Sequence, residues 1–175
     1  MDVTLLRRVA DELEILRLLA KVAQTVDDLD EEAYRSCFAD EVLCPAGTPD
    51  EDGRWQSVSS TDYARRAIAS ASRMDWTHHR IGHSVITLDG DRAEAAADVV
   101  VEMQASDELG KPERLTIGGR YELAFSRSPN GWRITKRALI RRYAIGNLEL
   151  LERGGQRRRP GVQSNSRRLG DPTGE

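Results

Sequence analysis

The chain has 175 residues, of which 39% are hydrophobic and 31% charged, and its formal net charge is -3. This length suits one domain built around a single hydrophobic core. The small negative charge gives no general attraction to nucleic acid, and no segment has the roughly 18 consecutive apolar residues of a membrane helix. The N-terminal segment also lacks the uninterrupted apolar run of a secretory signal, so we expect a cytoplasmic protein.

The first part of the chain predicts three helices. Apolar residues recur at three- and four-residue steps from Val3 to Asp28, which indicates one long helix with a buried stripe. The residues of this expected stripe are Leu6, Val9, Leu13, Leu16, Leu19, Ala20 and Ala23. Asp30 can cap a second helix over Glu31–Phe38, and a serine or threonine at 60–61 can cap a third over Asp62–Ser72.

The chain after Trp76 predicts an antiparallel sheet. Apolar and polar residues alternate there in long runs, and turn signals divide the runs into four strands. The turns fall at residues 89–91, 107–111 and 129–131. Short strands are also expected near Val42–Cys44 and Trp55–Val58, and Gly118 with Gly119 predicts a bulge that bends the sheet. The predicted fold is therefore α+β, a cone-shaped barrel of three helices packed on a curved sheet around an apolar pocket.

The predicted domain covers residues 1–150, and residues 151–175 are expected to form a flexible basic tail. Gly, Pro, Ser and Arg replace apolar residues in this tail, so it cannot bury enough surface to offset its chain entropy. The two cysteines, Cys37 and Cys44, make neither a disulfide framework nor a metal cluster. We expect two reduced thiols in or near the core.

Asp27 is a carboxylate on the apolar side of the predicted first helix. A rotation of about 100° per residue places it within roughly 20° of Leu16 and Ala20, and in line with Val9. Asp28 falls about a third of a turn away and should be solvated. A carboxylate carried inward by its own helix costs several kcal/mol unless a partner pairs with it. Alternatively, Asp27 lies just past the helix end and caps the next turn.

Two histidines share the inward face of the first long strand. His79 and His83 have the parity of Ile81 and Val85. An inward carboxylate and an inward imidazole can satisfy each other, which pairs His79 with Asp27. Such a carboxylate fixes the tautomer and stabilises the imidazolium, and it leaves the second ring nitrogen as a general base near neutral pH. Either histidine could instead be a core residue whose hydrogen bonds are satisfied.

Motifs for other chemistries are absent from the sequence. It contains no Gly-rich phosphate loop, no HExxH, no GxSxG and no CxxC, so it gives no support to nucleotide-dependent, zinc or serine-nucleophile chemistry. Only two of the three histidines could converge, because adjacent residues of a strand point to opposite faces. The sequence therefore predicts no metal site and no cofactor.

Three segments have the order and spacing of a known family. They are TVDDLDEEAYRSCFADEV, THHRIGHSVITLDGDRAEAAADV and GGRYELAFSRSPNGWRITKRALI. The resemblance covers about residues 5–147 and is to the SnoaL-like branch of the nuclear transport factor superfamily. That branch includes ketosteroid isomerase, scytalone dehydratase, bile acid dehydratase and hexachlorocyclohexane dehydrochlorinase. The resemblance implies the cystatin-like fold of this superfamily.

The resemblance also implies roles for single residues. The family's helix aspartate falls on Asp27 and its strand histidine on His79, and these form the base dyad in the dehydrochlorinase and the dehydratases. The arginine that follows a Trp-x-x-x-Lys pattern in some relatives falls on Arg137, and alternation puts it on the same face as Tyr143. The residues expected to bind substrate are His83, Arg137, Tyr143, Trp76, Val99, Val101, Met103 and Tyr121.

Several positions depart from these relatives. Val22 stands near the place of a lysine in the dehydrochlorinase, which makes haloalkane substrates unsuitable here. Val99, Val101 and Val26 stand where scytalone dehydratase has a second histidine and a tyrosine, so its detailed mechanism does not transfer. His83 stands where many relatives carry Asn, which could alter how the ligand is polarised.

The sequence favours a cofactor-independent lyase of the dehydratase type, or an isomerase, acting on an apolar oxygenated ring compound such as a polyketide, steroid or terpenoid. His79 would remove a proton, Asp27 would hold the imidazole, and Arg137 or Tyr143 would steady the developing negative charge. The alternatives are a non-catalytic β subunit of a ring-hydroxylating dioxygenase and a SnoaL-like protein that only binds ligand. The expected partners are a small apolar ligand and copies of the chain itself.

The expected homo-oligomer is a trimer or dimer. It would form through the outer face of the sheet, where Val100, Ile86 and Leu88 are predicted to stand among charged residues.

Overall fold

The computed structural model describes residues 3–46, 54–107 and 109–151. The predicted tail lies outside these residues from position 152 onward. No helix in the described part of the chain is long and apolar enough to cross a membrane.

The sheet has six strands in the order β2-β1-β6-β5-β4-β3, with β2 and β3 as its open edges. The strands are β1 (Phe38–Pro45), β2 (Trp55–Ser59), β3 (Trp76–Asp89), β4 (Arg92–Ser106), β5 (Pro112–Ser128) and β6 (Gly131–Gly146). The four long strands form an antiparallel meander, as predicted, and each of the three predicted turns falls between two of them. The two short strands were also predicted, but β1 joins β6 in parallel, which alternation alone could not indicate.

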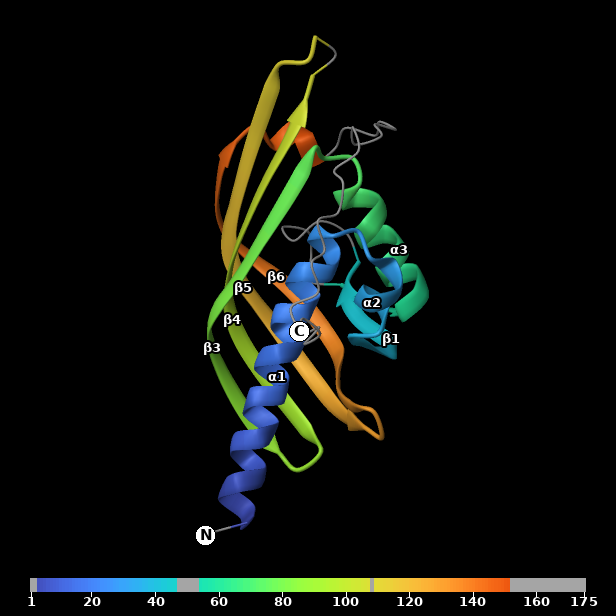
Figure 1. Cartoon of the computed structure of the whole chain (residues 1–175), viewed down its shortest axis with the longest axis vertical. Coiled ribbons are helices and arrows are strands. Elements are labelled where there is room, and N and C mark those ends of the chain that lie inside the picture. Colours follow the sequence, from blue (N-terminus) through green and yellow to red (C-terminus); the bar gives the residue numbers. More distant parts are fainter. Residues whose placement is uncertain (1–2, 47–53, 108, 152–175) are drawn as a thin grey trace, which may run out of the picture.

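Three helices pack on this curved, unclosed sheet: α1 (Val3–Asp27), α2 (Glu31–Arg35) and α3 (Ser60–Ala71), and a short 3-10 helix, η1 (Leu148–Leu151), follows β6. α1 crosses one face of the sheet, and α2 and α3 lie beside β1 (Figure 1). The predicted cap of α2 is confirmed, because the side chain of Asp30 accepts a hydrogen bond from the backbone N–H of Ala33 at 2.9 Å. The cap of α3 is Ser59, one residue before the predicted position.

The buried side of α1 differs from the predicted stripe. The buried residues of the helix are Asp11, Ile15, Leu18, Leu19, Val22, Ala23 and Val26. Leu6, Val9, Leu13 and Leu16 are 49%, 48%, 48% and 43% exposed and Ala20 is also exposed, so the predicted stripe was right only for Leu19 and Ala23. α1 carries apolar residues on two sides, and periodicity cannot say which side the sheet covers. The sheet covers the side on which Asp11 meets Arg127 of β5.

The core lies between α1 and the inner faces of the long strands. β4 alternates strictly, with Ala97, Val99 and Val101 among its buried residues, as the sequence predicted. Trp132, Tyr34 and Phe125 are the largest contributors from the other elements, and each is at most 2% exposed. Burying a side chain of this size stabilises a fold by about 1.5–3 kcal/mol relative to leaving it exposed.

The predicted state of the cysteines agrees with the structure. Cys37 and Cys44 are both buried free thiols, and burial raises the pKa of each. Thiols of this kind are less ionised at neutral pH and correspondingly less reactive.

A bulge in β3 reverses the face on which its second half points. The register with β4 shifts between Gly82 and Val85, and His83 adopts a φ of 44° there. His83 is consequently exposed, and Val85 is 70% exposed, so the predicted inward direction of both was wrong. Ile86 and Leu88 instead pack against the core, which corrects their predicted place on the outer face.

Two further bulges in β6 each change the face of the sheet on which the following side chains point. The register with β5 shifts between Ala124 and Phe125 and again between Gly118 and Gly119, where the sequence predicted a bulge. Between the two shifts Arg137 points inward, but beyond the second one Tyr143 lies over Gly118 and is 46% exposed. A β-carbon added to Gly118 would meet the ring of Tyr143 at 2.0 Å. The predicted common face of Arg137 and Tyr143 was therefore wrong.

Candidate active site

Asp27 is the last residue of α1 and stands beside the buried stripe, four positions after Ala23. Its side chain is only 16% exposed, because α1 packs directly on β3 at this end. The carboxylate is thus held against the strand that carries His79. This arrangement differs from a helix cap, since Thr77 and His79, which donate hydrogen bonds to Asp27, belong to β3 and lie fifty positions or more along the chain.

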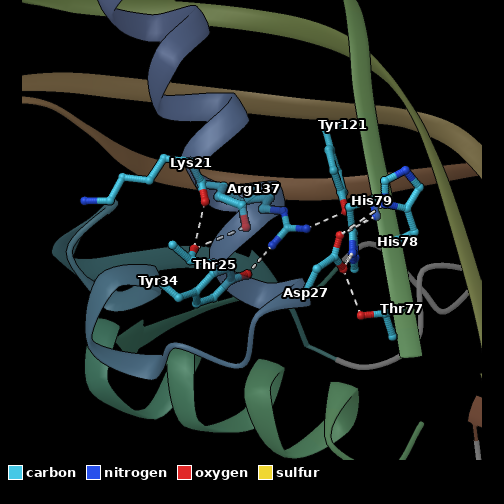
Figure 2. A network of polar contacts seen from close by, with 10 residues as sticks. Lys21, Thr25, Asp27, Tyr34, Thr77, His78, His79, Tyr121 and Arg137 are labelled. Atoms are coloured by element: carbon cyan, nitrogen blue, oxygen red, sulfur yellow. Dashed lines mark hydrogen bonds and ion pairs between the residues drawn. The ribbon is translucent and has the colours of Figure 1, made fainter. Parts of the chain in front are cut away.

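Asp27 and His79 form a close hydrogen-bonded pair. Nδ1 of His79 lies 2.7 Å from Oδ1 of Asp27, and the imidazole is 13% exposed (Figure 2). The backbone N–H of His79 donates to Oδ2 at 2.7 Å, and the hydroxyl of Thr77 donates to Oδ1 at 2.8 Å. An ionised carboxylate only accepts hydrogen bonds, so the proton of a neutral imidazole belongs on Nδ1 and the free lone pair on Nε2.

The hydrogen bonds to Asp27 favour its ionised form. Burial acts to raise the pKa of Asp27, but the hydrogen bonds from the ring and backbone of His79 and from Thr77 outweigh it, and the pKa lies below its ordinary value of 3.8. The carboxylate therefore stays charged at neutral pH and can stabilise a positive charge on the imidazole.

The lowered pKa of Asp27 predicts an acid dependence of stability. A carboxyl whose folded pKa is lowered adds stability above its unfolded pKa and loses it as the pH falls through the folded value. The free energy of unfolding of the wild type should therefore approach that of Asp27→Asn as the pH falls below 3.8. Denaturant unfolding of both proteins at neutral pH and below this value measures the difference, and Asp28→Asn, at an exposed neighbour, should show no such convergence. Parallel pH curves for wild type and Asp27→Asn would contradict this prediction.

Arg137 enters the same site from β6. One of its terminal nitrogens, Nη1, donates to the hydroxyl of Tyr34 at 2.6 Å and to that of Tyr63 at 3.4 Å, and the other, Nη2, donates to the hydroxyl of Tyr121. The guanidinium carbon also lies 4.2 Å from the centre of the Tyr121 ring, within the range of a cation–π contact. Figure 2 shows Arg137 directed from β6 toward the side of the site where Asp27 and His79 lie.

A cavity of about 180 Å³ joins the two groups. His79, Arg137, Tyr34, Thr77 and Ser70 provide its polar wall. Its apolar wall consists of Val26, Ala67, Ala71, Met74, Val101, Met103 and Leu151. A ligand in this cavity would contact the imidazole, the guanidinium and an apolar surface at once.

The predicted substrate-binding residues divide into two groups. Arg137, Val101 and Met103 line the cavity, Tyr121 contacts Arg137 from beside it, and Val99 is 2% exposed in the core. The other three are exposed and do not line the cavity, so the structure does not bring them to the predicted site. They are Trp76, His83 and Tyr143.

The direction of these three follows from their strands. Trp76 is 37% exposed because it alternates with inward Thr77 and His79, whereas His83 and Tyr143 are turned outward by the bulges in β3 and β6.

A second hollow reaches the pair from outside. A groove of about 430 Å³ between α1 and β3 is lined by both members of the pair and by His78 and Arg80. His78 is 59% exposed, and its Nδ1 lies 3.9 Å from Oδ2 of Asp27. Asp27 and His79 therefore stand between an inner cavity and an outer groove.

Sequence reasoning predicted Tyr121 but missed the other two tyrosines around Arg137. Tyr34 is 1% exposed on α2, and Tyr63 packs on the core from α3. Both rings flank Phe38, at centroid distances of 5.0 Å and 4.9 Å. The available signal was a tyrosine on the apolar side of each short helix, but nothing in one sequence indicates that these helices meet the last strand.

This arrangement can carry out general acid–base chemistry. An imidazole oriented by a carboxylate, next to an apolar cavity with a cation and hydroxyl donors, can move a proton and stabilise the oxyanion that forms. Among the described residues, no group of three or more His, Cys, Asp or Glu side chains could hold a metal ion.

Comparison with solved structures agrees with the predicted fold. The Kfla4162 protein from Kribbella flavida is 26% identical over 83% of this chain and 99% of its own, with a TM-score of 0.76. An NTF2-like protein with a cystatin-like fold from Novosphingobium aromaticivorans is 22% identical over 79% of this chain and 88% of its own, with a TM-score of 0.58.

Two of the enzymes named in the resemblance are also among the structural neighbours, a putative scytalone dehydratase and hexachlorocyclohexane dehydrochlorinase. The hexachlorocyclohexane dehydrochlorinase LinA-type3 from Novosphingobium barchaimii is 16% identical over 82% of this chain and 94% of its own, with a TM-score of 0.65. No curated protein matches the chain. A family model described as the SnoaL-like domain matches residues 7–138, from α1 to the middle of β6. The chain therefore belongs to the SnoaL-like domain family.

Proposed function

We propose that this protein is a cofactor-independent lyase of the dehydratase type, or an isomerase, in which His79 is the general base. The observation that carries this proposal is the 2.7 Å contact between Nδ1 of His79 and Oδ1 of Asp27, beside a cavity that His79 itself lines. The proposal also has support from a catalytic family, since dehydrochlorinases are among the structural neighbours.

The proposed reaction begins with removal of a proton from the carbon next to a carbonyl. Nε2 of His79 accepts this proton, the electron pair of the C–H bond moves into an enolate, and Asp27 stabilises the resulting imidazolium. The guanidinium of Arg137 is the cation available to the enolate oxygen, because it lines the same cavity. Tyr143 has no part in this step, since it is turned to the outer face.

Two outcomes follow from the enolate. In a dehydration, the C–O bond at the β carbon breaks, and the departing hydroxyl takes the proton from the imidazolium and leaves as water. In an isomerisation, the imidazolium returns the proton to the γ carbon of an unsaturated ketone. Both outcomes restore a neutral His79 and need neither an oxidant nor a cofactor.

The size of the cavity favours a single-ring substrate. A cavity of roughly 150 Å³ is large enough to bind benzene. The volume of about 180 Å³ suits one six-membered ring with a small substituent. Among the compound types considered from the sequence, one-ring polyketides and terpenoids fit this volume, and a four-ring steroid exceeds it.

Formation of 2-cyclohexenone tests the proposal. Dehydration of 3-hydroxycyclohexanone and isomerisation of 3-cyclohexenone both yield this conjugated ketone, whose ultraviolet absorbance reports turnover. We expect the purified protein to accelerate at least one of the two reactions with no added cofactor. Binding of these ketones without conversion would favour the ligand-binding alternative, and co-purification with an iron–sulfur α subunit would favour the dioxygenase-subunit alternative.

We also propose that the chain forms a homo-oligomer through the outer face of the sheet. Val85, Ile140, Tyr143 and Ile145 expose between 46% and 70% of their surface on the two long strands β3 and β6. Exposed apolar side chains in this number favour contact with another copy of the chain. Sedimentation equilibrium at micromolar concentration should give a dimer or trimer. A monomer under those conditions would contradict this prediction.

A further inference from the structure

The charge of Arg137 is solvated by neutral groups. Its guanidinium donates to the hydroxyls of Tyr34, Tyr63 and Tyr121, and burial raises the pKa of Tyr34 and of Tyr63, so both hydroxyls stay protonated at neutral pH. Among the described residues, no carboxylate forms an ion pair with Arg137. A guanidinium is always charged in a protein, so a positive charge without a formal counter-charge stands at the cavity wall.

The carboxylate in this site, that of Asp27, is hydrogen-bonded to residues other than Arg137. The carboxylate of Asp27 accepts hydrogen bonds from the ring and the backbone of His79 and from Thr77. An anionic group on the ligand would therefore meet the charge of Arg137 directly, because opposite charges attract strongly in a site with little water.

The donors of Arg137 are only partly used. Three of its five N–H groups reach the tyrosine hydroxyls, which leaves one N–H of Nη2 and the N–H of Nε for another acceptor. These N–H groups belong to neighbouring nitrogens of a planar guanidinium, and a carboxylate accepts from two such donors with both of its oxygens. The tyrosines hold the guanidinium rigidly, so little side-chain entropy is lost when the anion binds.

The opposite wall of the cavity is apolar. Val26, Met74, Val101 and Met103 face the space that Arg137 enters, and the volume of about 180 Å³ holds one ring. The ligand that matches both walls has a small apolar body and one negative group.

We propose that the cavity binds a single-ring carboxylate, with its carboxylate on Arg137 and its ring on the apolar wall. This inference names the ligand class of the cavity in which the proposed reaction takes place. The reaction of this ligand depends on the proposed function, whereas the binding of its carboxylate depends only on Arg137 and the residues around it. The reacting ketone and the carboxylate are then separate groups of one ring compound, because the α proton of a simple carboxylate is a poor acid. With such a ligand the carboxylate accepts hydrogen bonds from the two remaining N–H groups of Arg137, and the guanidinium acts on the enolate oxygen through its charge alone.

Titration calorimetry with two matched probes tests the inference. Cyclohexanecarboxylate and cyclohexanecarboxamide have nearly the same shape and differ in charge. At about pH 8, above the ordinary pKa of histidine, we expect the wild type to bind the carboxylate at least about tenfold more tightly than the amide. Equal affinities, a preference for the amide, or binding of neither probe at millimolar concentration would overturn the inference. This comparison needs no variant.

Two arginine variants assign the preference to a residue. Arg137→Gln should bind the two probes about equally, whereas Arg133→Gln should retain the preference. Arg133 lies on the same strand, and its Nη1 donates to the backbone oxygen of Trp132, so its replacement controls for the loss of one positive charge. A preference that survives in folded Arg137→Gln would also overturn the inference.

The test separates this inference from the proposed function. His79→Gln should keep the preference for the carboxylate while it loses turnover of the ketones. If the wild type converts neutral ketones but does not prefer the carboxylate, the proposed reaction is supported and the inference of an anionic ligand is contradicted.

Discussion

Replacement of His79 by Gln should lower kcat for enone formation by roughly 10²-fold or more, because it removes the base that accepts the substrate proton. Asp27→Asn should have an effect of the same order, since the amide keeps the shape but lacks the charge that stabilises the imidazolium. Steady-state kinetics gives kcat and thermal unfolding gives the stability, and both are measured on the same preparation of each variant.

A purely structural pair would behave differently. Breaking a buried pair that serves only stability costs about 3–5 kcal/mol of folding free energy and leaves the activity of the folded fraction unchanged. His83→Gln is the matched control, because His83 lies on the same strand but is exposed beyond the bulge. We expect His83→Gln to retain wild-type kcat, and undiminished turnover in His79→Gln would eliminate His79 as the base.

The largest loss of stability should come from the other end of α1, in the variant Asp11→Ala. Asp11 is 7% exposed, and its Oδ1 accepts hydrogen bonds from the guanidinium of Arg127 and from the indole N–H of Trp132, the latter at 3.4 Å. Removal of the carboxylate leaves both donors without this acceptor and Arg127 without its buried counter-charge. We expect a loss of about 3 kcal/mol in the free energy of unfolding.

A second carboxylate on the same guanidinium provides the control. Asp91 accepts from Nε of Arg127 at 3.0 Å, but its side chain is 70% exposed. Exposed ion pairs contribute about 0–1 kcal/mol, so Asp91→Ala should cost far less than Asp11→Ala. Neither residue lines the cavity beside His79, and kcat of the folded variants should not change. Equal losses of stability in the two variants, measured by denaturant unfolding, would contradict the assignment of Asp11 as a buried structural charge.

The sequence predicted those features that depend on the residue pattern within a single helix or strand. Hydrophobic alternation and turn residues located the long strands, and the fold class followed from their order. The pairing of Asp27 with His79 was also predicted, because both break an apolar pattern and each supplies what the other lacks when buried. Asp27 does face His79, although the apolar stripe predicted for α1 was misplaced around the helix.

The errors at His83 and Tyr143 have a common physical origin in the bulges. A period of two identifies the inward face of a strand only while the register is regular, and one extra residue turns every later side chain to the other face. His83 lies in such an irregularity, and another one separates Tyr143 from Arg137. The cluster of Tyr34 and Tyr63 with Arg137 depends on tertiary contacts among α2, α3 and β6, which no local pattern contains.

Proton removal by His79 is the central claim, and deuterium exchange into cyclohexanone measures it most directly. This ketone has the acidic protons of the proposed substrates but no leaving group, so proton abstraction is observed without elimination. In D₂O, the wild type should accelerate incorporation of deuterium next to the carbonyl, and folded His79→Gln should lose roughly 10²-fold of that acceleration, as followed by NMR. Equal exchange rates with wild type and His79→Gln would contradict the account.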